Sequence, residues 1–581
     1  MAGPSRSFVG SLCLGQIDDS LILPFPSMSG EQAELVSSVL EAFDALLEPH
    51  AESFREWDTA GEFPPELIEE LKEFGAFGLV IPEEFGGMGF GATAYSRTLQ
   101  QIGKHDASVA VTIGAHSSIG MRGLLLFGTD EQKARFLPAL ATGEQIAAFC
   151  LTEPGAGSDA ASVRTTAVRD GDEWVLNGTK LWITNGGIAD FFTVFAKTGD
   201  AEERRRMSAF IVTRDMPGVT IGPHEDKMGL RASSTTSVYF DDVRVPAANL
   251  LGEEDAGFKV AMQILNSGRT GLGGGCVGGM KRMLELATGH AKERVQFGVP
   301  IAQFGMIKGK IGQMVVDCYA AESAVNIVNG LIDRGHDEYA VEAAISKVFA
   351  SEALWRSADE ALQIAGGTGF MREYPYERVV RDSRINRIFE GTNEVLRLFI
   401  ALTTMNEVGR ELKDLGASLS GIFDDPIKGF GVLSGYAQRR ASMATGLGSQ
   451  AAAFSGVVPE LREEAAAYER ATRRLASAVD RVLRKHGKNI IGKQFASKRL
   501  ADAMIDMFVL GCVISRVSTA IADQGAGAVE REIDILRVFQ RQALERVEDN
   551  FAHVDNNVDE TLKAIADHAV AAGGFSWDNL P

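Results

Sequence analysis

The stretch Arg387-Ile388-Phe389-Glu390-Gly391-Thr392-Asn393-Glu394-Val395-Leu396-Arg397 places one carboxylate at a break between two helical patterns. Apolar residues alternate with arginines ahead of it, and apolar residues recur at helical spacing behind it. Gly391 allows the backbone to bend, and Thr392 and Asn393 favour a helix start because their side chains accept first-turn amides. We therefore expect Glu390 just before a helix, partly desolvated among apolar neighbours, with a raised pKa that suits a general base.

The same pattern has a second interpretation, in which Glu390 caps the helix or forms a salt bridge. Arg384, Arg387 and Arg397 are close in sequence and offer partners. The pattern alone favours this structural interpretation, because charged networks that only stabilise a fold are common. Other parts of the chain are needed to decide between the two.

A second stretch, Phe149-Cys150-Leu151-Thr152-Glu153-Pro154-Gly155-Ala156-Gly157-Ser158-Asp159, combines hydroxyl groups with glycines that let a ligand approach the backbone. It resembles the flavin-binding signature of the acyl-CoA dehydrogenases, and Arg387–Glu394 resembles their C-terminal signature. The resemblance runs from about Ser7 to the C-terminus, and at this length it is most similar to the very-long-chain branch. It implies a mainly α fold with a middle β-domain: a helical N-terminal domain, a β-barrel, a four-helix bundle and an extra C-terminal helical domain.

Bulk properties exclude several other classes of protein. The net charge of -20 argues against nucleic-acid binding, which needs a basic surface. The five cysteines are scattered without a Cys-x-x-Cys pair, so we expect no metal site and no disulfide framework. The sequence contains no run of 18 apolar residues, so we expect no segment that spans a membrane. Met1–Ser7 is too short for a targeting sequence, which favours a bacterial cytoplasmic protein, or a mitochondrial one only if a presequence was removed.

The order of patterns predicts five segments: helical 1–145, strand-rich 146–251, helical 252–410, a linker 411–458 and helical 459–581. Residues 8–30 are expected to be irregular, and Asn177-Gly178 is expected to join two short strands between 174 and 187. Gly273–Gly278 matches Gly-x-Gly-x-x-Gly by spacing but has no preceding strand, so we interpret its glycines as helix contacts.

Two further segments each have two interpretations. Small residues between 108 and 127, among them Gly120 and Gly123, either allow close helix packing or leave room for a long acyl tail. Residues 411–455 contain apolar residues beside basic ones, and are either an interfacial segment touching a membrane, such as the inner membrane, or a loop packing on its own protein.

The resemblance implies two groups of FAD contacts. Phe149, Leu151, Thr152 and Ser158 would lie along the flavin and its pyrophosphate, and Trp182 and Thr184 beside the ring, although Trp182 alone indicates a core strand residue. Arg294, Phe297, Phe304, Gln363 and Gly367 would meet the adenosine half across a homodimer interface, with Thr392 and Glu394 closing the site. Gly305 stands where many members have Gln after the Phe, a departure shared by the very-long-chain branch.

The resemblance also implies a reaction. Glu390 would remove the α-proton of an acyl-CoA thioester while the β-hydride passes to flavin N5. The substrate contacts would be Ser158, Asn266, Arg269, Phe389 and Gly391. Some branches place the base immediately before the arginine of the 266–269 segment, where this chain has Gly268, which leaves Glu390. Lys227–Ser233 matches a further signature, which we interpret as a feature of the fold near CoA.

The expected function is that of an oxidoreductase of fatty-acid β-oxidation, an FAD-dependent dehydrogenase of long or very long acyl-CoA that makes trans-2-enoyl-CoA. An electron-transferring flavoprotein would accept the electrons. The alternatives are an acyl-CoA oxidase that uses oxygen, and a flavoprotein scaffold for respiratory-complex assembly.

Overall fold

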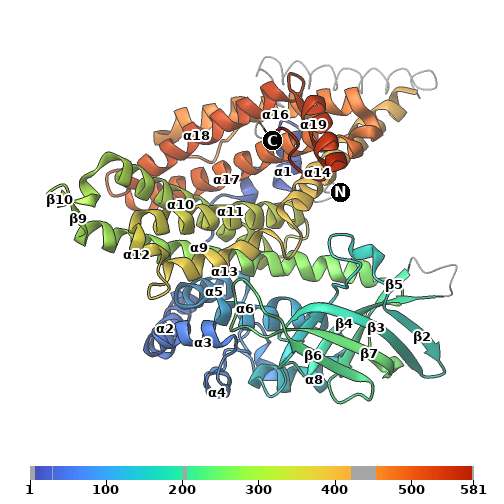
Figure 1. The fold of residues 1–581 in the computed structure, drawn as a ribbon. Coiled ribbons are helices and arrows are strands. Elements are labelled where there is room, and N and C mark those ends of the chain that lie inside the picture. Colours follow the sequence, from blue (N-terminus) through green and yellow to red (C-terminus); the bar gives the residue numbers. More distant parts are fainter. Residues whose placement is uncertain (1–6, 29, 200–205, 421–452, 579–581) are drawn as a thin grey trace. The chain divides into compact units, whose positions relative to one another are not determined.

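The computed structural model describes residues 7–28, 30–199, 206–420 and 453–578, and its chain divides into two compact units (Figure 1). The larger unit is Pro24–Val395, and the smaller one combines Met1–Leu23 with Leu396–Pro581. The predicted class, mainly α with a middle β-domain, is confirmed. The grouping of the first 23 residues with the C-terminal part was not predicted, because sequence order does not reveal which segments pack together.

The larger unit begins with short helices around an aromatic core. These are α2 (Gly30–Leu47), α3 (Ser53–Ala60), α4 (Pro65–Glu73), α5 (Ala92–His105), α6 (Ala107–Gly114), α7 (Arg122–Phe127) and α8 (Asp130–Thr142). Phe43, Phe54 and Phe77 are fully or almost fully buried between them. The apolar stretch 108–127 is helical as predicted, but η4 (Ala115–Gly120) is a π-helical turn between α6 and α7. Such turns occur often at functional sites.

Eight strands form one sheet in the order β6-β7-β3-β2-β4-β5-β8, with β1 parallel to β4 beside this path. Their bounds are β1 (Ala147–Cys150), β2 (Thr166–Asp170), β3 (Glu173–Thr184), β4 (Phe191–Thr198), β5 (Arg206–Thr213), β6 (Val219–His224), β7 (Thr235–Pro246) and β8 (Leu250–Leu251). β4 is buried on both faces, because Phe192 and Val194 join the core enclosed by the sheet while Phe191 and Phe195 pack with helical residues. The sheet curls so that β5 also contacts β7.

One strand prediction was wrong. Asn177-Gly178 does not turn the chain, because β3 continues without a break from Glu173 to Thr184. The pair instead lies at a β-bulge, with a register shift against β7 between Leu176 and Gly178. A Cβ at Gly178 would overlap Thr165, so glycine is needed there for a close approach rather than for a hairpin turn.

Long helices complete the larger unit: α9 (Gly257–Glu293), α10 (Gly305–Asp333) and α11 (Ala340–Ala365), followed by α12 (Gly367–Phe370) and α13 (Tyr376–Arg384). A small hairpin of β9 (Val295–Gln296) and β10 (Val299–Pro300) joins α9 to α10. Two glycines of the Gly-x-Gly-x-x-Gly spacing lie at helix contacts, since a Cβ at Gly273 would lie 2.9 Å from Val325 and one at Gly278 would overlap Gln100. A Cβ at Gly275 would meet nothing within 4 Å, so the helix-contact interpretation is confirmed for Gly273 and Gly278 alone.

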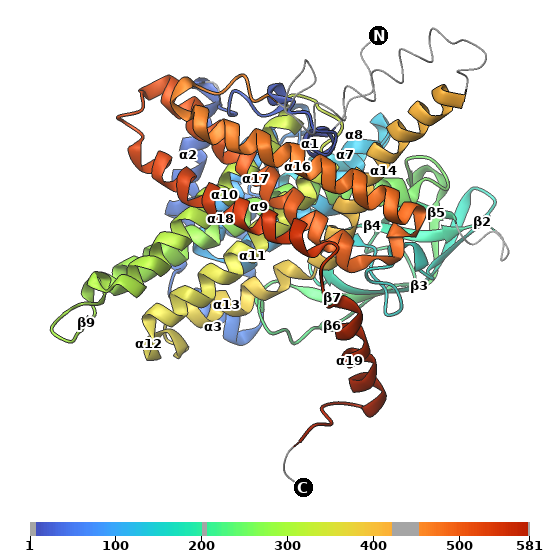
Figure 2. The same cartoon turned by 90° about the horizontal axis from the view of Figure 1, so that it is seen from above.

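The smaller unit holds α1 (Phe8–Cys13), most of α14 (Asn393–Ser420), α16 (Arg462–His486), α17 (Gln494–Gln524), α18 (Glu530–His553) and α19 (Asp559–Ala572). α17 packs against both α16 and α18 (Figure 2). Residues 8–30 are not all irregular, because Ser7 caps α1 by accepting from the Gly10 amide at 2.9 Å and the helix is buried. α14 continues to Ser420, so the first ten residues of the predicted linker are helical. Most of the proposed membrane-touching segment, 421–452, lies outside the described residues.

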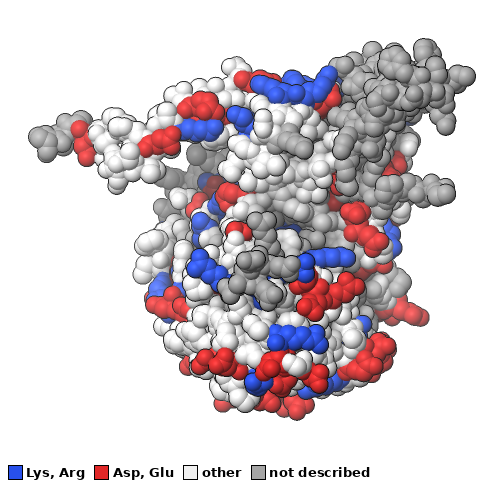
Figure 3. Space-filling view, turned by 90° about the vertical axis from the view of Figure 1, so that its right-hand side faces the viewer, with Lys and Arg blue, Asp and Glu red and all other residues white. Residues whose placement is uncertain are grey.

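Two helical segments are long and apolar enough to cross a membrane by length and composition, Ala107–Phe127 and Gln494–Gln524. Length and composition alone are weak evidence for a membrane span, so the expectation that no segment crosses a membrane is not contradicted. Both segments are mostly buried within the protein, which is typical of core helices in soluble folds. On the face drawn in Figure 3, acidic and basic side chains of the described residues are interspersed and form no continuous basic surface.

Candidate active site

Glu390 lies in the predicted break between helices. The turn η8 (Ile385–Arg387) ends the preceding helical segment, and α14 begins at Asn393. Glu390 has φ 55° and Gly391 has φ 92°, so two consecutive residues adopt left-handed backbone. A non-glycine residue in this region costs about 1–3 kcal/mol and is found mainly where the surroundings require it. Thr392 Oγ1 accepts the Val395 amide at 3.2 Å, which confirms its predicted capping role.

The Glu390 carboxylate is desolvated. Although the residue as a whole is only partly buried, its Oε2 is inaccessible and accepts no hydrogen bond from the described residues. Burial raises the pKa of Glu390 to about 7, against the opposing effects of Lys347 and Arg269. The salt-bridge interpretation is not supported, since Arg397 pairs with Asp502 at 2.6 Å and the Arg384 guanidinium lies over the Trp355 ring.

Two predicted substrate contacts, Arg269 and Asn266, are linked to each other and to the Glu390 backbone, and Gly268 lies beside the carboxylate. Arg269 Nε lies 3.4 Å from Glu390 O, and Arg269 Nη1 donates to Asn266 Oδ1 at 2.6 Å. Burial lowers the pKa of Arg269 to about 10 while the Glu390 charge opposes this. A Cβ placed on Gly268 would lie 3.3 and 3.4 Å from the two Glu390 carboxylate oxygens. The alternative base position of the family therefore faces the position that Glu390 occupies.

The two predicted flavin segments are adjacent. The Leu181 amide donates to Thr152 O at 2.9 Å, which joins the loop after β1 to β3. The Trp182 side chain is 62% exposed at a second irregularity of β3, with φ 56°, so the interpretation as a core residue was wrong. Phe149 packs edge-on against Phe195 at the end of β1.

The residues around these segments fit FAD. The exposed indole offers a flat surface for an isoalloxazine ring. Gly155 and Gly157 have open space where a side chain would be, and Ser158 is exposed beside them, so backbone amides and a hydroxyl are accessible to phosphate oxygens.

A buried ion pair holds the predicted flavin loop. Lys180 Nζ lies 2.7 Å from Glu153 Oε1, and both side chains are almost completely buried. Glu153 also accepts from the Thr165 amide at 3.0 Å and its hydroxyl at 2.6 Å, while Lys180 donates to Leu151 O at 3.2 Å. The sequence patterns did not predict this pair, although Glu153 lies in the 149–159 stretch and Lys180 between residues 174 and 187.

The π-helical turn η4 packs against both Gly268, beside the candidate base, and β1. Ile119 packs on Gly268, and a Cβ at Gly120 would lie 2.8 Å from Ala147 of β1. A Cβ at Gly123 would lie 2.9 Å from the side chains of Ile264 and Leu251. Gly120 and Gly123 therefore serve close packing, and the interpretation that they make room for an acyl tail was wrong. Gly114 does have open space, with its nearest neighbour at 4.0 Å.

The second group of predicted FAD contacts lies elsewhere in the unit. Gln363 is 16 residues beyond Lys347 in α11, which places it roughly 24 Å away along the helix axis. Ile301 and Ile364 share one core cluster with Phe304. The hairpin that follows Arg294 therefore lies beside the end of α11, just before Gly367. Phe297 is 94% exposed. One copy of the chain therefore does not bring this group to Glu390.

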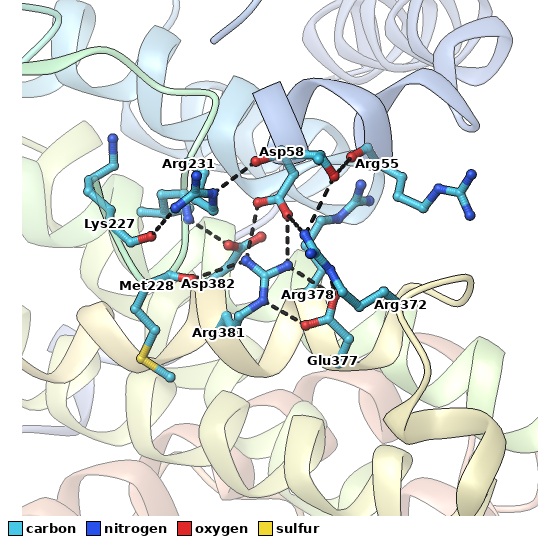
Figure 4. A network of polar contacts seen from close by, with 12 residues as sticks. Arg55, Asp58, Lys227, Met228, Arg231, Arg372, Glu377, Arg378, Arg381 and Asp382 are labelled. Carbon is cyan, nitrogen blue, oxygen red and sulfur yellow. Dashed lines mark hydrogen bonds and ion pairs between the residues drawn. The ribbon is translucent and has the colours of Figure 1, made fainter. Parts of the chain in front are cut away.

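The signature Lys227–Ser233 ties the sheet to two helices (Figure 4). A Cβ at Gly229 would lie 2.5 Å from the backbone of Arg381 in α13. The Arg381 guanidinium donates to Met228 O at 3.0 Å and pairs with Asp58 of α3 at 2.7 Å. This part of the sequence supports domain packing, and it anchors the helix that leads to the candidate base.

Comparisons with known proteins cover nearly the whole chain. Three sequence profiles of acyl-CoA dehydrogenases match: the N-terminal domain at residues 29–144, the middle domain at 148–243 and the C-terminal domain at 255–404. The profile "ACAD9/ACADV, C-terminal domain" matches residues 459–575. Within the described residues, no group of three or more His, Cys, Asp or Glu side chains is placed to hold a metal ion.

Individual relatives agree with these profiles. The human mitochondrial very long-chain specific acyl-CoA dehydrogenase is 42% identical over 99% of this chain and 89% of its own length. An acyl-CoA dehydrogenase of Bacillus subtilis is 43% identical over 64% of this chain and 97% of its own. A crystal structure of an acyl-CoA dehydrogenase from Bacillus anthracis in complex with FAD superposes with a TM-score of 0.82, at 32% identity, covering 95% of this chain and 92% of that one.

Proposed function

Since the chain belongs to the acyl-CoA dehydrogenase family, we propose that it oxidises long or very long acyl-CoA thioesters to trans-2-enoyl-CoA in fatty-acid β-oxidation, with FAD as cofactor and Glu390 as base. The observation that carries the assignment of the base is the Glu390 carboxylate on a left-handed turn beside Gly268 and Arg269, with its Oε2 buried and accepting no hydrogen bond from the described residues.

The surroundings of Glu390 suit removal of a weakly acidic α-proton. A desolvated carboxylate is a stronger base than one in water, because burial disfavours its charge. The same burial stabilises the neutral carboxyl after the proton has moved. Arg269 and Lys347 oppose this effect and keep part of the Glu390 population ionised near neutral pH.

FAD, when bound, supplies the acceptor for the hydride that leaves the β-carbon. The segments around Phe149, Thr152, Ser158, Trp182 and Thr184 would hold its ring and pyrophosphate. Arg294, Phe297, Phe304, Gln363 and Gly367 would contact the adenosine half in a homodimer, because they lie too far along the bundle to reach their own copy's ring. Thr392 and Glu394 follow the base directly and would close the site.

The proposed substrate length and partners rest on the relatives. The human relative is named as specific for very long chains, and the open space at Gly114 is compatible with an extended tail. An electron-transferring flavoprotein is the proposed acceptor, and the bacterial cytoplasm is the proposed location. Liposome flotation, with and without residues 411–455, tests the membrane-contact hypothesis. Most of this segment lies outside the described residues.

Anaerobic bleaching of the bound flavin by a series of acyl-CoA thioesters tests this function. We expect bleaching by long chains and formation of the 2-enoyl product. Absence of bleaching at every chain length would contradict the proposal. Rapid recovery of the flavin colour in air would favour the oxidase instead.

A further inference from the structure

The Glu390 turn needs a restraint that sequence analysis did not identify. Glu390 and Gly391 both have positive φ, and for Glu390 this conformation is unfavourable in isolation. A general base must also be held within a fraction of an ångström and a few tens of degrees of its working position. Local sequence does not provide such a restraint, because Gly391 makes the turn easy to form and equally easy to lose.

The ammonium group of Lys347 contacts this turn from α11. Lys347 is fully buried, and its Nζ donates to Gly391 O at 2.8 Å and to Asn393 Oδ1 at 2.9 Å. Asn393 in turn donates to Ser351 Oγ at 3.1 Å and to Glu352 Oε1 at 3.0 Å. Lys347 and Ser351 are four residues apart, so they share one face of α11 and contact the turn on both sides of Thr392.

Burying the Lys347 ammonium group at this position of α11 costs desolvation free energy. Taking an ammonium out of water is unfavourable unless it is paired, yet no carboxylate of the described residues lies within 4.0 Å of Nζ. An apolar side chain of similar length would pack there without that cost. The position therefore points to a use for the hydrogen-bond donors and the charge themselves.

The charged and titratable groups around Glu390 come from three helices. They are Lys347 of α11, Arg269 and Cys276 of α9, and Tyr95 of α5. Lys347 and Arg269 favour the ionised carboxylate, and burial lowers the pKa of Lys347 to about 8 while the Glu390 charge opposes this. Cys276 and Tyr95 are buried with their pKa values raised, so both are neutral near pH 7.

We propose that Lys347 is a positioning residue for the dehydrogenation: through Gly391 O and Asn393 it holds the left-handed Glu390–Gly391 turn, and thereby the carboxylate beside Gly268. This inference rests on the proposed role of Glu390 as base. Lys347 acts through the backbone and the electrostatics of the turn, and it does not touch the reacting atoms.

The test compares Lys347→Met, which removes donors and charge, with Lys347→Arg, which keeps the charge. In the FAD-loaded enzyme we expect Lys347→Met to lower kcat at least about tenfold with KM changed less, since the base is misplaced rather than the substrate site lost. The midpoint of its kcat/KM profile should move to higher pH, because one cation that favours the carboxylate is gone. Lys347→Arg should keep the wild-type midpoint and recover part of kcat.

A matched control is Lys310→Met. It removes a lysine of α10 that pairs with Glu360 of α11, and it should leave kcat and the midpoint unchanged. A Lys347→Met enzyme with kcat within twofold of wild type and an unmoved midpoint would overturn the inference. If that variant does not fold, Asn393→Ala decides, because it removes one acceptor of Lys347 without removing the charge. Wild-type kcat in Asn393→Ala would then overturn the inference.

Glu390→Gln, measured in parallel, separates this inference from the proposed function. If Glu390→Gln retains wild-type turnover, the assignment of the base fails. If Glu390→Gln is inactive while Lys347→Met is fully active at an unmoved midpoint, only the role of Lys347 fails.

Discussion

The pH dependence of the dehydrogenation tests the state of Glu390 directly. If Glu390 is the base, as proposed, its carboxylate is the active form, so the rate must rise as pH rises through the pKa of the free enzyme. Burial places that pKa at about 7 rather than at the usual 4.5. The ionised fraction is then about 9% at pH 6 and about 91% at pH 8, which predicts a roughly tenfold increase in kcat/KM. With an unshifted pKa the carboxylate is already about 97% ionised at pH 6, and the rate would hardly change.

The assay is the anaerobic rate of flavin bleaching at limiting acyl-CoA, measured at intervals between pH 5.5 and pH 8.5. Binding of the enoyl-CoA product over the same range, followed by the flavin spectrum, controls for loss of substrate or cofactor. A kcat/KM that is flat between pH 6 and pH 8 would refute the reasoning, because it would show that the base is not desolvated in the free enzyme.

Three further predictions follow from contacts of the same unit. The Glu390→Gly variant should recover part of its lost turnover when Gly268→Glu and Ile119→Ala are added, because a side chain at position 268 points at the place of the Glu390 carboxylate. Ile119→Ala removes a side chain that a Cβ at position 268 would meet at 2.7 Å. A triple variant that binds product but is inactive would contradict this. Glu390→Gln should stabilise the protein more at pH 8 than at pH 5, measured by thermal melting. The pKa of Glu390 is raised in the folded state, so the free energy of unfolding of wild type falls by up to about 3 kcal/mol as pH rises from 4.5 through 7. A Tm difference between variant and wild type that does not depend on pH would contradict this prediction. Lys180→Met should lose FAD on gel filtration, because it leaves Glu153 buried without its partner at a cost of about 3–5 kcal/mol; full retention of FAD would show that the pair does not hold the flavin loop.

Local patterns predicted much of the fold. The apolar spacing in the 252–410 segment predicted helices there, and α9, α10 and α11 lie in it, each burying an extended apolar face. The break at Glu390 was also predicted, since Gly391 and Thr392 are local signals that need no distant partner.

The errors arose where distant contacts decide the structure. Asn177-Gly178 is a strong hairpin signal, but at Gly178 the close approach of Thr165 explains the glycine, and β3 continues. Phe8, Val9 and Leu12 have helical spacing after a capping Ser7, a signal for α1 that the nearby prolines obscured.

The missed site residues have the same explanation. Lys347 contacts Gly391, which is 44 residues away in the sequence, and Lys180 pairs with Glu153 across 27 residues. No local sequence pattern predicts these two contacts. A lone lysine within the apolar run Ala343–Ala350 was nevertheless a signal that a buried charge has a specific partner.

The most direct measurement of the central claim is single-turnover flavin bleaching by Glu390→Gln. Glutamine keeps the shape of the side chain but cannot take up the α-proton. We expect the variant to bind FAD and enoyl-CoA as wild type does, and to bleach its flavin slower by a factor of about 10²–10⁴. Bleaching at the wild-type rate would contradict the account, because another group would then remove the proton.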